Sequence, residues 1–166
     1  MIKKILFLLL FFFPFNSYGV IKVDITRGNL NPLPLAVSPL AIDNDSKKEF
    51  EKILNKKNIG SEISAIVEKN LKTSGLFNPL DKEAFLQKPD IANLKPRFED
   101  WQLIKAQALI TGKVNFVDGK LRVEFRLWDI LAGREMMALA FTTVPTNWRR
   151  VGHIISDKVY ERLTGE

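Results

Sequence analysis

Apolar and polar residues alternate most regularly in the second half of the chain. Residues 108–117 and 121–128 flank an Asp-Gly pair at 118–119, a dipeptide that favours the type I′ turn of a β-hairpin. An Ala-Gly pair then predicts another turn, after which residues 135–144 can form a third strand. The alternation therefore predicts a three-stranded antiparallel meander with one face buried.

The end of the chain has helical spacing instead. Asn147 is placed to cap a first turn, and Gly165 is placed to end the helix in the left-handed conformation. Between them, apolar residues recur every three or four positions and form one stripe: Trp148, Val151, Ile155, Val159 and Leu163. We expect this amphipathic helix to pack its stripe against the sheet.

Three more helices are predicted in the first two thirds of the chain. A Ser-Lys-Lys-Glu sequence has the form of a capping box and predicts a helix over residues 46–57. Apolar spacing predicts a second helix over residues 61–73. Pro96 can begin a third, which runs through Leu103.

Shorter strands complete the fold. Residues 20–26 alternate like a half-buried strand, while residues 35–40 and 76–80 are short apolar runs. The resulting order is β-β-α-α-β-β-β-α, with room for an added helix near residue 50, and it predicts one α/β (α+β) domain over residues 20–166. We expect a mixed sheet with an antiparallel three-strand meander, packed by two to three helices.

The beginning of the chain has the pattern of a secretory signal peptide over residues 1–19. Two lysines precede the apolar run from Ile5 to Phe15, and the small residues Ser17 and Gly19 occupy the positions that signal peptidase recognises. As a helix this run spans about 16 Å, against roughly 30 Å for a bilayer core. We therefore favour cleavage after Gly19 and a periplasmic protein over the alternative of a membrane anchor.

Composition limits the chemistry. The chain has no cysteine and one histidine, so disulfides and metal sites built from thiolate or imidazole ligands are not expected. The glycines do not form Gly-x-Gly, which argues against nucleotide-binding loops. Ser156 projects about 60° to the side of His153 on the predicted helix, so these residues and Asp157 do not form a triad. We expect no enzymatic activity and no cofactor.

Several segments, taken in order, resemble the amino-terminal domain of the TolB family of the Tol-Pal envelope system. The terminal helix carries the pattern Trp-Arg-Arg-x-x-His-x-x-x-Asp-x-x-Tyr-Glu-x-Leu-Thr-Gly. Further matching pieces are residues 71–77, Phe98 with Trp101, residues 108–114 and Arg-Leu-Trp-Asp at 126–129. In the family a β-propeller follows this domain, and no propeller sequence is present here.

The resemblance implies a periplasmic adaptor that supports outer-membrane integrity, cell division and protein import. In the family the mature amino-terminal segment binds TolA, the partner anchored in the inner membrane. An alternating segment at a free end can do so by adding a strand to a partner sheet, and the alternative is an edge strand of its own sheet. The residues that correspond here are Val20, Ile21, Lys22, Val23, Asp24, Ile25, Thr26, Arg27 and Gly28. The family's contact with Pal belongs to the propeller.

Two further expectations concern the surface. The net charge is +6. Nucleic acid is not the expected partner of an exported protein. An anionic envelope ligand such as lipopolysaccharide or peptidoglycan is the alternative to TolA. A non-functional TolB fragment is another. On the terminal helix, a polar face opposite the apolar stripe is either solvated or meets a neighbouring domain; it consists of Arg149, His153, Asp157 and Tyr160.

Overall fold

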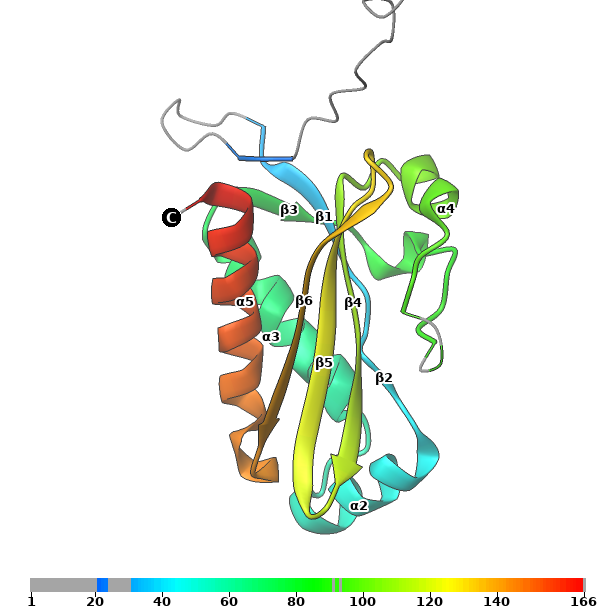
Figure 1. Ribbon diagram of the computed structural model, residues 1–166, viewed down its shortest axis with the longest axis vertical. Helices are drawn as coiled ribbons and strands as arrows, with labels where there is room; N and C mark the ends of the chain where they lie inside the picture. Colours follow the sequence, from blue (N-terminus) through cyan, green and yellow to red (C-terminus); the bar gives the residue numbers. More distant parts are fainter. Residues whose placement is uncertain (1–20, 24–30, 91, 93, 166) are drawn as a thin grey trace, which may run out of the picture.

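A computed structural model describes residues 21–23, 31–90, 92 and 94–165 (Figure 1). The predicted signal peptide and its cleavage site therefore lie outside the described residues. The strands form one six-stranded mixed sheet, in which β3-β1-β4-β5-β6 are neighbours and β2 pairs with β4. Their bounds are β1 Leu33–Val37, β2 Ala41–Ile42, β3 Phe77–Pro79, β4 Ala108–Val117, β5 Lys120–Asp129 and β6 Arg134–Thr143.

The antiparallel half of the sheet is the predicted meander. Asp118 and Gly119 both have positive φ, 49° and 75°, as a type I′ turn requires, and the turn brings Val117 opposite Lys120. The strand β6 then pairs antiparallel with β5, with a register shift between Leu127 and Trp128. The other half is parallel, because β1 pairs in parallel with both β3 and β4.

Two long helices cover one face of the sheet. They are α3, Ile59–Thr73, and α5, Trp148–Thr164, which lie on the same side of the meander in Figure 1. The predicted stripe of α5 is buried, and it shares one core with alternate residues of β5 and with α3. The helix α2, Asn44–Leu54, lies at the end of the sheet near the β4–β5 turn (Figure 1).

The opposite face has a smaller core. The helix α4, Phe98–Leu103, places Trp101 beside Trp128 and Ile130 of the β5 end. Two short 3₁₀ helices, η2 at Lys82–Ala84 and η3 at Pro145–Asn147, complete the described elements. The expected mixed sheet, meander and packing helices are thus confirmed.

The predicted cap at Ser46 is wrong, and Asn147 occupies the predicted N-cap position of α5 without making the predicted hydrogen bond. Asn147 makes no capping hydrogen bond, because the 3₁₀ turn before α5 turns its side chain toward Thr143. The cap of α2 is Asp43, which accepts from the Ser46 backbone N–H at 2.7 Å, so that the helix begins before residue 46 and ends at Leu54 rather than at 57.

Asp43 also ties α2 to the sheet. Its carboxylate accepts from the Ser46 hydroxyl at 2.7 Å and from the Asn115 amide of β4 at 2.9 Å. Burial raises the pKa of Asp43, but these hydrogen bonds outweigh burial and hold the pKa below its ordinary value. The charged carboxylate is therefore the form that stabilises the fold.

We expect Asp43→Asn to reduce the acid sensitivity of folding. Because the folded-state pKa is lowered, the stabilisation is present above the unfolded-state pKa and is lost as pH falls through the folded value. Urea unfolding between pH 3 and pH 7 should show lower stability for the variant near neutrality and a flatter decline below about pH 4. Asp45→Asn is the control, since that side chain is 92% exposed; an identical response of both variants would contradict the assignment.

A second expectation concerns Gly60, where α3 passes close to the chain after β1. A Cβ on Gly60 would lie 2.2 Å from the Leu40 carbonyl oxygen, a contact that only a backbone shift can relieve. A Gly→Ala change inside a helix normally stabilises by about 1 kcal/mol. Here we expect Gly60→Ala to destabilise by roughly 1–3 kcal/mol, measured by thermal unfolding, while Ser61→Ala on the exposed side of the same turn has little effect.

Candidate interaction site

The buried carboxylate of Asp129 organises one end of the domain. Asp129 is the last residue of β5 and is fully buried. One oxygen accepts from the Ala132 N–H of the following turn at 2.9 Å, and the other accepts from the Ile21 N–H at 3.3 Å. The side chain that shapes the β5–β6 turn therefore also holds the amino-terminal segment.

A second backbone hydrogen bond fixes the same segment. The Val23 N–H donates to the Leu163 carbonyl oxygen at 2.8 Å, which belongs to the last turn of α5 and has no partner within the helix. The Val23 side chain is buried in the main core, while Lys22 between the two anchors is exposed and lies against Gly165. Both described ends of the chain thus meet at the carboxyl end of α5.

The predicted strand over residues 20–26 is wrong for the three residues of this segment that the structure describes, 21–23. Ile21, Lys22 and Val23 are not part of the sheet, because the N–H groups of Ile21 and Val23 bind Asp129 and Leu163 instead of a neighbouring strand. The remaining predicted partner-binding residues lie outside the described residues: Val20, Asp24, Ile25, Thr26, Arg27 and Gly28.

The predicted polar face of α5 lies partly against α3. The His153 Nδ1 atom is 2.8 Å from the Asn70 amide nitrogen, which also donates to the Ser156 hydroxyl at 3.1 Å. Because the amide is the donor, Nδ1 accepts and the proton of a neutral ring is on Nε2. Ser156 donates in turn to the Gly152 carbonyl oxygen at 2.9 Å. These three polar side chains join the two helices.

The remaining residues of this face are only partly solvated. Tyr160 is half-buried, with its ring edge against Phe77 of β3 at 6.1 Å between centroids. The Arg149 guanidinium lies over the Trp148 ring at 4.3 Å, and Asp157 is exposed. Residues 149, 153 and 157 remain accessible at the surface, whereas Tyr160 contributes to the core.

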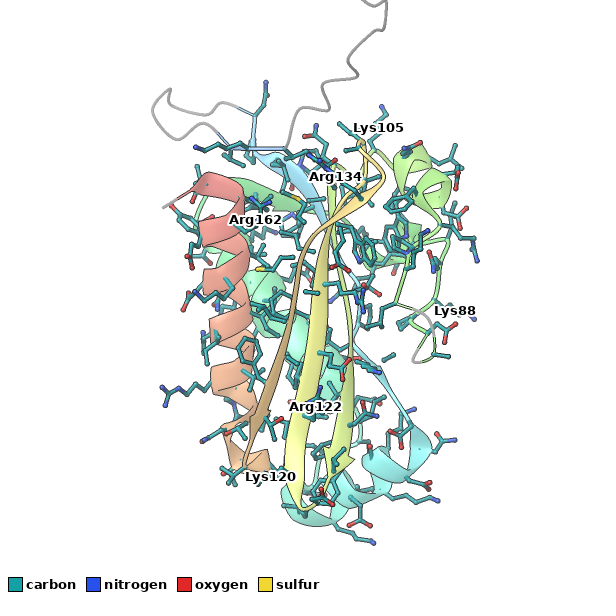
Figure 2. All side chains as sticks on the ribbon, in the orientation of Figure 1. Lys88, Lys105, Lys120, Arg122, Arg134 and Arg162 are labelled. Carbon is teal, nitrogen blue, oxygen red and sulfur yellow. The ribbon has the colours of Figure 1, made fainter. Side chains whose placement is uncertain are left out.

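Positive charge around α2 is largely neutralised by ion pairs. Two ion pairs lie within the lysine-rich helix α2, Lys48 with Asp45 and Lys52 with Glu49, and Lys57 of the following segment pairs with Glu51 of the helix. Figure 2 shows other cations, Lys88, Lys105 and Lys120, at separate ends and sides of the domain. The lysines around α2 and these three cations therefore do not form a shared site for an anionic ligand.

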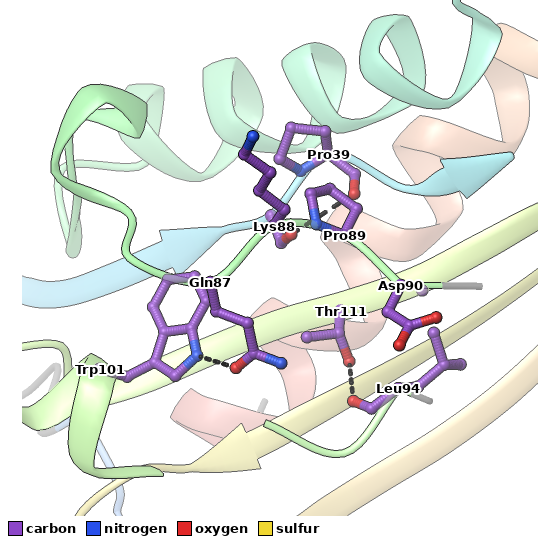
Figure 3. A pocket seen from close by; sticks show the side chains of 10 residues that line it. Pro39, Gln87, Lys88, Pro89, Asp90, Leu94, Trp101 and Thr111 are labelled. Atoms are coloured by element: carbon purple, nitrogen blue, oxygen red, sulfur yellow. Dashed lines mark hydrogen bonds between the residues drawn. The ribbon is translucent and has the colours of Figure 1, made fainter. Parts of the chain in front are cut away.

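A small hollow lies between the sheet and the chain before α4 (Figure 3). Its volume is about 20 Å³, which is room for about one water molecule. The Gln87 side-chain oxygen accepts from the Trp101 indole N–H at 3.1 Å and from the Arg97 N–H at 2.9 Å, so the polar groups there are used structurally. Among the described residues, no group of three acidic or histidine side chains could hold a metal ion.

Asp129 was not singled out by sequence reasoning, and its role can be tested. Asp129→Ala should leave the N–H groups of Ala132 and Ile21 without their acceptor, at a loss of about 1–3 kcal/mol. Asp129→Asn, with one carbonyl oxygen, should lose less. Urea unfolding measures the stability, and hydrogen exchange at Ile21 and Ala132 should accelerate beyond the global change; equal exchange protection in all three proteins would contradict the assignment.

Comparison with known proteins places this geometry in a family. The family model of the TolB amino-terminal domain matches residues 21–136. The Tol-Pal system protein TolB of Pelagibacter ubique is 74% identical over all 166 residues, and the chain spans 37% of that relative's length. In the described part of the chain, no helix has the length and apolar character needed to cross a bilayer.

Solved structures agree on the fold. The crystal structure of TolB from Acinetobacter baumannii superposes with a TM-score of 0.62 at 23% identity, covering 81% of this chain and 29% of that one. A hypothetical protein from Chlamydia trachomatis superposes with a TM-score of 0.53 at 13% identity, covering 82% of this chain and 100% of that one. By its sequence match and its fold, this chain belongs to the TolB amino-terminal domain family.

Proposed function

We propose that this chain is a periplasmic interaction module of the Tol-Pal system, which serves envelope integrity and cell division, and that its amino-terminal segment from Val20 to Gly28 binds TolA. The 74% identical relative is named a Tol-Pal system protein, which supports membership of that system. Export through the predicted signal peptide supports the periplasmic location. In the family Pal is bound by the propeller, so the proposal assigns no Pal contact to this domain.

The way in which Ile21–Val23 is attached carries the proposal. These residues are held by two N–H groups, which donate to the Asp129 carboxylate and the Leu163 carbonyl oxygen, and by the buried side chain of Val23. They use no strand pairing within the sheet. A segment that is anchored to the domain but is not a strand of its sheet is suited to pair with the sheet edge of a partner.

Calorimetric titration with the carboxy-terminal domain of TolA tests this. We expect binding by the protein, loss of binding when residues 20–28 are deleted, and at least about tenfold weaker binding for Ile25→Asp, because a buried-face apolar residue of an added strand would become charged. Ile53→Asp is the matched control, since Ile53 is 48% exposed on α2. Circular dichroism shows whether each variant folds.

Two results would overturn the proposal. One is equal affinity of the deletion variant and the intact protein for TolA. The other is the absence of any heat of binding when the intact protein or its variants are titrated with TolA. Salt provides a further distinction, because binding through strand pairing should persist at 0.5 M salt, whereas binding of an anionic envelope ligand through surface charge should weaken strongly.

A further inference from the structure

The two edges of the sheet are protected to very different degrees. The edge strand β3 has three residues, and its last is Pro79, which has no N–H to offer. The other edge strand, β6, has ten residues, and after Glu135 it contains no charged residue and no proline. Short length, proline and charge are the usual means of blocking an edge. In the described part of the chain, β6 is paired with β5 alone.

The register shows which backbone groups of β6 are free to pair. A two-residue hairpin makes Val117 and Lys120 a hydrogen-bonded pair, so the next residue of β5, Leu121, and every second one after it bond to β6. Their partners are Thr143, Phe141, Leu139 and Met137. The N–H and C=O groups of Ala138, Ala140 and Thr142 therefore point away from β5.

A side chain of α5 contacts the same strand. The Arg162 Nε–H of α5 donates to the Met136 carbonyl oxygen at 3.2 Å. Met136 is the extra residue at the register shift and has no partner on β5, so this contact lies where the regular ladder of β6 is interrupted. The Met136 carbonyl is reached by an exposed side chain from the upper part of α5 (Figure 2).

Two hollows lie between this edge and α5. The first, of about 350 Å³, is lined by residues 140–143 of β6 and, on the helix side, by Arg150 and Ile154. The second, of about 330 Å³, is lined by Met137 and, on the helix side, by Lys158 and Arg162. These four helix residues recur every fourth position, so they form a single stripe along α5. We call the hollows and this stripe the β6–α5 groove.

The charge of the groove is positive. Three of the four stripe residues are cations, namely Arg150, Lys158 and Arg162. Glu161 is the acidic residue of its lining, and it pairs with Lys158 at 2.7 Å. Arg150 has no ion-pair partner among the described residues, and its side chain is exposed.

We propose that the β6–α5 groove docks an acidic, extended peptide segment of a partner protein. The segment adds to the sheet as a strand beside β6, bonding to Ala138, Ala140 and Thr142. Its acidic side chains, at alternate positions, lie over Arg150 and Lys158. A second copy of this chain fits less well, because edge-to-edge pairing would bring two sets of the same cations together.

A synthetic peptide of ten alternating Glu and Val residues, labelled with fluorescein, tests the proposal by fluorescence anisotropy. We expect saturable binding to the protein and no binding when Lys replaces every Glu. Two further peptides are N-methylated, one on all Val and one on all Glu residues. Only alternate N–H groups of an added strand face the edge, so one methylated peptide should lose binding and the other should keep it.

Protein variants locate the binding. Arg150→Glu and Lys158→Glu should each weaken binding by about tenfold or more, whereas Lys72→Glu, the same change at an exposed site on α3, should not. Ala140→Pro removes one outward N–H and leaves the β5–β6 hydrogen bonds intact, so it should abolish binding with an unchanged circular dichroism spectrum.

The proposal is overturned by binding of both methylated peptides, by equal effects of the groove and α3 variants, or by absence of saturable binding. It is also overturned if sedimentation shows a dimer that Ala140→Pro dissociates, because the occupant would then be a second copy. The deletion of residues 20–28 should leave peptide binding unchanged, which separates this site from the proposed TolA segment.

Discussion

The burial of alternate side chains along β5 decides the arrangement of the whole domain. Leu121, Val123, Phe125 and Leu127 are all fully buried on the face that receives α3 and α5. A shift of one residue in register would turn the entire set to the opposite face. Trp128, the next residue, points to the opposite face because successive strand residues alternate, and it enters the smaller core beneath α4. A single strand thereby serves both hydrophobic cores, with its last residue, Asp129, fixing the turn that follows.

Local patterns predicted the elements whose signals lie within a few residues. The hairpin at 118–119, α3 and α5 could be found because turn chemistry and apolar periodicity are short-range properties. The segment at 20–26 shows the limit of such reasoning. Its alternation fits a strand, but the N–H groups of Ile21 and Val23 find acceptors on Asp129 and Leu163. These acceptors come from distant parts of the chain, which periodicity does not detect.

The candidate site was predictable in part for the same reason. Helical geometry placed Ser156 to the side of His153, yet it gave no indication that the Asn70 amide of α3 would contact both. It also assigned Tyr160 to the polar face, although that ring reaches Phe77 at the edge of the core. Spacing along one helix defines directions around its axis, whereas burial depends on where the neighbouring helix and strand are placed.

The hydrogen bond between Val23 and Leu163 has a consequence for the order of folding. It joins nearly the first described residue to nearly the last, so its loop can close only after the rest of the domain has formed. The chain is synthesised from its amino-terminal end, so the amino-terminal segment forms before α5, the helix on which it docks. By the same reasoning this hydrogen bond is the contact most readily lost by local unfolding, since terminal segments open without disturbing the core. The docking of Val23 therefore depends on a completed α5.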